Sequence, residues 1–119
     1  MTSTSDAAAR LTATLKAVAG LRFYKLGATV DRAGVVVGMP RIKFETYAPG
    51  TATSAEFPVF LVVPFDEQAQ AKLWEFVEPV AAALESIADT TVSAADPTIY
   101  TSGKADLPAY SFTAEMSLS

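Results

Sequence analysis

The clearest pattern of apolar and polar positions lies in the last ten residues. Apolar residues alternate strictly with polar ones there, at Tyr110, Phe112, Ala114, Met116 and Leu118. A period of two places these side chains on one face of a β-strand. The pattern therefore predicts an antiparallel strand with one face in the core and the other in water.

The second pattern joins a strand to a helix. An uninterrupted apolar run over 57–65 predicts a central strand, 57–64, that must be covered on both faces. Asp66 is then expected to cap a helix. One face of that helix is apolar throughout, at Ala69, Leu73, Phe76, Val77, Val80, Leu84 and Ile87. Pro79 predicts a kink or two short helices. A partner subunit is one possible cover for the strand, but other parts of the chain could also cover it.

A first helix is expected near the start of the chain. Thr4 or Ser5 caps it, with Asp6 in the first turn. Its apolar stripe is Leu11, Leu15 and Val18, and Gly20 is expected to end it.

The stretch between the helices is expected to be mostly strand. Residues 21–33 are predicted to be an irregular connector with aromatic anchors. A strand begins at 35–37, is interrupted by a bulge or bend at Gly38 and Pro40, and resumes with Ile42 and Phe44.

Together these elements predict one α+β domain over residues 1–119. Its order is α-β-β-α-β-β, with two helices packed on a small mixed or antiparallel sheet of about four strands. The last two strands form a hairpin around Gly103 and Lys104. Residues 1–4 are expected to be a flexible N-terminus, and residues 48–56 a flexible hairpin loop.

The composition argues against catalysis. The chain has no cysteine and no histidine, which excludes zinc sites, thiol nucleophiles, disulfides and histidine acid–base chemistry. Its glycines form neither a P-loop nor a dinucleotide fingerprint. Its helical acids fit a solvated face better than a carboxylate pair or a magnesium site. We therefore predict no catalytic, cofactor-binding or metal-binding residue, and no enzyme.

Charge is divided unevenly along the chain. Residues 1–43 carry seven basic groups against two acids, a net +5, whereas residues 44–119 carry two against eleven, a net −9. This polarity fits either an ordinary solvated surface or complementary faces for head-to-tail assembly. The basic cluster with its aromatic neighbours also resembles a nucleic-acid patch, but the acidic half and the pI of about 4.6 argue against that interpretation.

The candidate interface residues come from the basic cluster, the loop and the second helix. They are Arg22, Phe23, Tyr24, Lys25, Arg41, Lys43, Pro49, Gly50, Thr51 and Trp74. Trp74 lies near the edge of the helix's apolar face, so it is either a core residue or an interface anchor.

Four stretches together resemble one protein family. They are 34–42 (GVVVGMPRI), 57–64 (FPVFLVVP), the helix 66–87 and the closing strand 110–118. This arrangement resembles the tail terminator proteins of long-tailed, non-contractile bacteriophages over residues 8–118. One departure is Glu78-Pro79-Val80, because similar family members often carry a glycine and a serine where the helix breaks.

The resemblance implies a structural role in the virion, at the tail or neck, after assembly in the host cytoplasm. A homohexameric ring would cap the tail tube, end its polymerisation and join it to the head-connector or stopper protein. Genomic DNA would pass through the lumen without sequence recognition. Two alternatives stay open: a neighbouring neck protein such as a head-closure or stopper ring, and a small soluble dimeric accessory domain. No membrane partner is expected, because the longest apolar run is far below the ~20 residues of a span.

Overall fold

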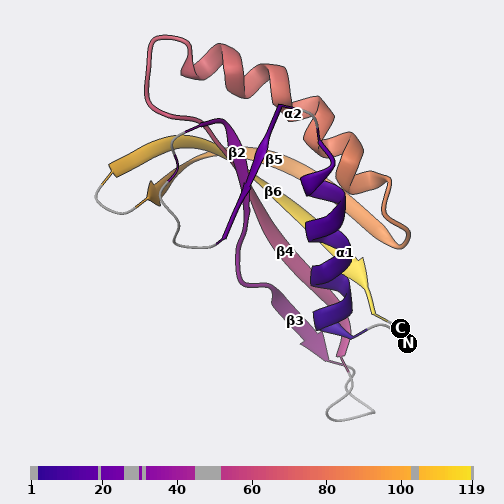
Figure 1. The fold of residues 1–119 in the computed structure, drawn as a ribbon. Coiled ribbons are helices and arrows are strands. Elements are labelled where there is room, and N and C mark those ends of the chain that lie inside the picture. Colours follow the sequence, from indigo (N-terminus) through magenta and orange to yellow (C-terminus); the bar gives the residue numbers. More distant parts are fainter. Residues whose placement is uncertain are drawn as a thin grey trace.

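The computed structural model describes residues 3–18, 20–25, 30, 32–44, 52–102 and 105–118. In chain order its elements are α1 (Thr4–Lys16), β1 (Arg22–Tyr24), β2 (Gly34–Val37), β3 (Arg41–Phe44), β4 (Ala52–Val62), α2 (Ala69–Glu85), β5 (Thr90–Ser102) and β6 (Ala105–Ser117) (Figure 1). The predicted α+β class with two helices is confirmed. The predicted count of about four strands and the order α-β-β-α-β-β are wrong, because the described part of the chain has six strands in the order α-β-β-β-β-α-β-β.

The strands form one open sheet. Its order is β1-β2-β4-β6-β5, and β3 also pairs with β4. Of the pairings between described strands, that of β1 with β2 is parallel and the others are antiparallel. Strands β2 and β3 lie end to end along the same side of β4, opposite 59–62 and 52–56 respectively. They are therefore one strand broken in the middle.

The predicted interruption between these two strands is confirmed as a bulge. Three residues, 38–40, oppose two residues of β4, 57 and 58. The Gly38 amide donates to the Pro58 carbonyl over 2.8 Å. A Cβ on Gly38 would lie 2.8 Å from Pro58 Cγ, so glycine permits this close approach. Pro58 is tolerated in a central strand because a bulge interrupts the ladder beside it.

Both helices differ from expectation, α1 at its two ends and α2 at Pro79. Ser3, not Thr4 or Ser5, caps α1, and its hydroxyl accepts from the Asp6 amide over 3.1 Å. Helix α1 ends at Lys16, so Val18 lies beyond it and Gly20, with φ of 83°, belongs to the following turn. Helix α2 runs through Pro79 as one helix of 17 residues, which overturns the alternative of two short helices.

Three of the expected irregular segments also need correction. The connector 21–33 contains β1, which pairs with β2 at one edge of the sheet. Within the expected loop 48–56, residues 52–56 belong to β4, and residues 48–51 lie outside the described residues. At the N-terminus, Ser3 and Thr4 already form the start of α1, and residues 1 and 2 are not described.

The main core lies between the helices and one face of the sheet. It joins Leu11 and Leu15 of α1 and Leu73 and Leu84 of α2 to alternating residues of β4 and β6. The buried residues in it from β2, β4 and β6, and from the positions just after β4 and β6, are Val35, Ala55, Phe57, Val59, Leu61, Val63, Phe112, Ala114, Met116 and Leu118. The alternation predicted for the last strand and the apolar stripe of α2 are therefore confirmed.

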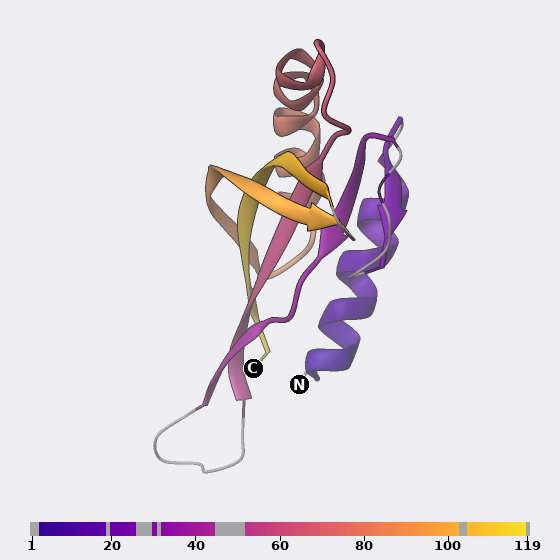
Figure 2. The same ribbon diagram turned by 90° about the vertical axis from the view of Figure 1, so that its left-hand side faces the viewer.

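Among the residues that the structure describes, the opposite face of the sheet is covered at one end. A second buried cluster there contains Tyr24, Val30, Val36, Val62, Tyr100, Leu107 and Ala109. Figure 2 shows the end of β5 passing across this face. Farther along β4, Pro58 and Phe60 remain half-buried. The described part of the chain thus supplies a partial second cover for the doubly apolar central strand.

Candidate interaction surfaces

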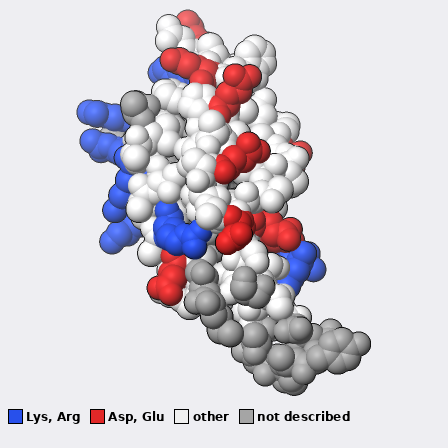
Figure 3. Space-filling model, turned by 90° about the vertical axis from the view of Figure 1, so that its right-hand side faces the viewer, with Lys and Arg blue, Asp and Glu red and all other residues white. Residues whose placement is uncertain are grey.

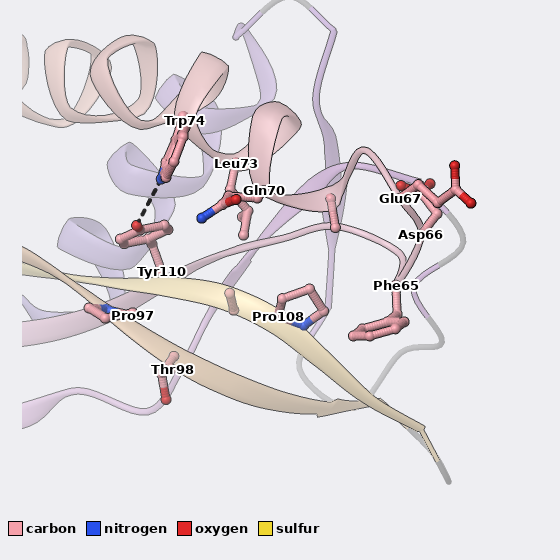
Figure 4. Close-up of a pocket in the computed structure, with 12 residues that line it drawn as sticks. Phe65, Asp66, Glu67, Gln70, Leu73, Trp74, Pro97, Thr98, Pro108 and Tyr110 are labelled. Atoms are coloured by element: carbon pink, nitrogen blue, oxygen red, sulfur yellow. Dashed lines mark hydrogen bonds between the residues drawn. The ribbon is translucent and has the colours of Figure 1, made fainter.

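A pocket of about 360 Å³ lies between the start of α2 and the β5–β6 hairpin (Figure 4). Its lining residues are Phe65, Asp66, Glu67, Ala69, Gln70, Leu73, Trp74, Pro97, Thr98, Pro108, Ala109 and Tyr110. We call it the α2 pocket. Its walls are mostly apolar, and two carboxylates, Asp66 and Glu67, stand at one end. The chemistry of these residues suits an apolar side chain accompanied by a positive charge.

Asp66 shapes the mouth of the α2 pocket. Its Oδ1 accepts from the Gln68 amide over 2.8 Å, and its Oδ2 lies 3.2 Å from Lys72 Nζ. These contacts lower the pKa of Asp66, and the hydrogen bond from the Gln68 amide has the largest effect. The structure places the N-cap at Gln68 and starts α2 at Ala69, so Asp66 closes the turn before the helix instead of capping it as predicted.

Two aromatic residues of the α2 pocket, Phe65 and Trp74, are exposed. Phe65 is 82% exposed and Trp74 59% exposed, and Ile99 on the adjacent strand is 68% exposed. Trp74 Nε1 donates to the Tyr110 hydroxyl over 3.1 Å, which fixes the indole above the sheet (Figure 4). The core interpretation of Trp74 is therefore wrong. Sequence reasoning missed Phe65 as a surface residue because it ends the continuous apolar run of the central strand.

The predicted basic connector divides into surface and core. Arg22 and Lys25 are exposed, as expected for contact residues. Phe23 is half-buried against the main core, with Lys16 Nζ 5.7 Å from its ring centroid. Tyr24 is 8% exposed in the second cluster, and its hydroxyl accepts from the Arg32 amide over 3.2 Å. Phe23 and Tyr24 therefore support the fold of the subunit, and substituting them would test folding before it tested assembly.

A second exposed surface lies on β3. We call Met39, Arg41, Ile42, Lys43 and Phe44 the β3 patch. Met39 is 78% exposed and Phe44 60% exposed, and all four residues of the strand are exposed. Lys43 Nζ lies 2.8 Å from Glu56 Oε1. This ion pair raises the pKa of Lys43 and lowers that of Glu56. The patch thus combines apolar side chains with two basic ones.

The remaining predicted contact residues, Pro49, Gly50 and Thr51, lie outside the described residues. Among the residues that the structure describes, no group of three or more acidic side chains is placed to hold a metal ion. In the same part of the chain, no helix is both long and apolar enough to cross a membrane. Figure 3 shows Lys and Arg gathered mainly along one side of the molecule, with Asp and Glu in a band beside them.

We predict that Asp66→Ala lowers the thermal midpoint at pH 7 and that this loss shrinks at pH 3. A carboxyl whose pKa is lowered by folding stabilises the fold above its unfolded pKa. That contribution disappears as pH falls below about 4 and through the folded pKa. Thermal melts of both proteins at the two pH values measure the difference. Glu67→Ala, in the same turn, is the matched control. A loss for Asp66→Ala that is equal at both pH values would contradict the prediction.

Compared with known proteins, the chain matches no protein-family model and no curated protein.

Proposed function

We propose that this chain is a structural virion protein, the ring-forming tail terminator of a long-tailed, non-contractile bacteriophage. Six copies would form a ring that caps the tail tube, ends its polymerisation and joins it to the head-connector or stopper protein. Genomic DNA would pass through the lumen. The proposal begins from the family resemblance of 34–42, 57–64, 66–87 and 110–118.

The observation that supports assembly most strongly is the exposed apolar surface at two separate places. A small monomeric domain seldom leaves several large apolar side chains uncovered in groups. Here Phe65 and Trp74 are exposed at the α2 pocket, and Met39 and Phe44 at the β3 patch. Contacts between copies would remove both groups from water, as subunit interfaces do.

Solution mass and particle imaging test this proposal. We expect the purified protein to have the mass of six chains by light scattering and to form hollow six-fold rings in negative stain. We further expect the rings to bind the ends of purified tail tubes. Rings that bind head connectors but leave tube ends bare would favour the stopper alternative. A protein that stays monomeric at every concentration would contradict the assembly role.

One observation favours the second candidate, a dimeric accessory domain. The α2 pocket, at about 360 Å³, falls within the ~300–1,000 Å³ typical of small-ligand sites. A dimer that binds an apolar peptide with a basic residue, and forms no ring, would support this candidate over the terminator.

A further inference from the structure

We propose that the α2 pocket of one copy receives the β3 patch of a second copy, so that subunits join head to tail. This inference rests on the self-assembly in the proposed function and names the two faces that meet. The occupant of the pocket is the β3 patch of a second copy of this chain. Apolar fit, charge and position support this choice.

The apolar parts of the two faces are complementary. The pocket offers Phe65, Leu73 and Trp74 around a hollow of about 360 Å³. The β3 patch offers Ile42 and Phe44, which are 37% and 60% exposed; the pairing of β3 with β4 is irregular between Lys43 and Phe44. Inserting the Phe44 ring into the pocket would bury aromatic surface on both copies, and buried aromatic anchors dominate interface energies.

The charges of the two faces are also complementary. Arg41 and Lys43 are exposed beside the apolar residues of β3, and Lys43 is already paired with Glu56 of its own chain. Asp66 and Glu67 stand at the end of the α2 pocket, and Asp66 is already paired with Lys72. The charge match between the two copies is therefore that of Arg41 with Glu67. Two α2 pockets facing each other would instead bring like charges together, which disfavours pocket-to-pocket pairing.

The two faces lie at opposite ends of the molecule, whose longest dimension is 51 Å. Figures 1 and 2 show β3 at one end and the start of α2 at the other. A contact between two different surfaces is heterologous, and repeating it gives a closed ring or an open filament. The same contact can therefore form every subunit interface of a ring.

Cysteine cross-linking tests the contact directly, because the natural chain has no cysteine. We would prepare Met39→Cys and Gln70→Cys as separate proteins, mix them and add a short bismaleimide. Both side chains are exposed, Gln70 lies in the α2 pocket, and Phe44 stays in place. We expect a covalent dimer only in the mixture. The double variant Met39→Cys/Gln70→Cys should give a ladder of covalent oligomers.

The matched control pairs Gln70→Cys with Ala13→Cys, an exposed position on α1. It should give no covalent dimer. Circular dichroism of each variant checks that the fold is retained. Rings without a link between positions 39 and 70 would overturn this contact and leave the proposed function standing. Dimers from Met39→Cys alone would show a two-fold contact and overturn the head-to-tail arrangement. A protein that is monomeric at every concentration would overturn both.

Charge reversal gives an independent measurement. Arg41→Glu should weaken self-association about two- to fivefold at low salt, the range expected of one exposed ion pair. Adding Glu67→Lys in the same chain should restore self-association, since every interface between copies then carries the same ion pair with its charges exchanged. Trp74 is the only tryptophan, so its emission should shift to the blue as concentration rises and the α2 pocket is covered. If Glu67→Lys failed to restore the self-association of the Arg41→Glu variant, the proposed pairing of Arg41 with Glu67 would be contradicted.

Discussion

Replacing Phe112 with alanine is expected to lower the free energy of unfolding by about 3–5 kcal/mol. Phe112 is 0% exposed and lies on β6, opposite Val59 of β4 on one side and Ala95 of β5 on the other. Its ring belongs to the core beneath the helices. Truncation removes buried apolar surface and leaves a cavity that the surrounding sheet cannot readily close. A small domain is stable by only about 5–15 kcal/mol, so the loss would be a large share of the total.

Phe65→Ala is the matched control, because the same side chain is removed from a position that is 82% exposed. We expect that substitution to change the free energy of unfolding by less than about 0.5 kcal/mol. Urea titrations of both variants, at concentrations where each is monomeric, measure the difference without a contribution from assembly. Equal losses for the two variants would contradict the placement of Phe112 in the core and Phe65 at the surface.

The parts of the fold that could be predicted are those with a local period. The alternation around Phe112 and the stripe through Leu73 and Leu84 identify one face of a strand and one face of a helix. Both faces are buried in the structure. The break at Gly38 and Pro40 was also predictable, because both residues disturb a strand wherever it pairs.

The missed strands depend on pairing between residues far apart in the sequence. Residues 52–56, Ala-Thr-Ser-Ala-Glu, have the composition of a loop. They become strand because β3 pairs on one side of them and β6 on the other. Strand β1 has only three residues, too few to show a period, and its partner β2 is reached through 25–33. Neither pairing leaves a signal in the segment itself.

The candidate surface was also predicted only in part, because the exposure of some of its residues depends on contacts far apart in the sequence. The exposure of Arg22, Lys25, Arg41 and Lys43 follows from their charge. The aromatic residues are different, because apolar side chains are placed by what packs over them. Trp74 is exposed where the β5–β6 hairpin leaves the α2 pocket open. Tyr24 is buried because its ring crosses a glycine on the neighbouring strand.

That glycine is Gly34, and Gly34→Ala is expected to lower the free energy of unfolding by about 1–3 kcal/mol. The β1–β2 pairing sets Gly34 opposite Arg22. A Cβ on Gly34 would lie 2.5 Å from Tyr24 Cε2 and 2.6 Å from the Arg22 carbonyl oxygen. Both separations are too short for real contacts. The edge strand β1 must therefore move away from β2, and the second core cluster must open with it. Urea titration of the monomer measures the loss.

A double-mutant cycle with Tyr24→Leu separates the two contacts. The shorter side chain removes the ring from above Gly34, so Gly34→Ala should cost less in that background. The difference is expected to be about 0.5–3 kcal/mol, as for other residues in direct contact. Recovery should stay incomplete, because the Arg22 oxygen belongs to the main chain and a side-chain change leaves it in place. If Gly34→Ala lost no free energy of unfolding in the Tyr24→Leu background, the tyrosine ring alone would require the glycine. If Gly34→Ala lost none in the natural background, the parallel pairing of β1 with β2 would be contradicted.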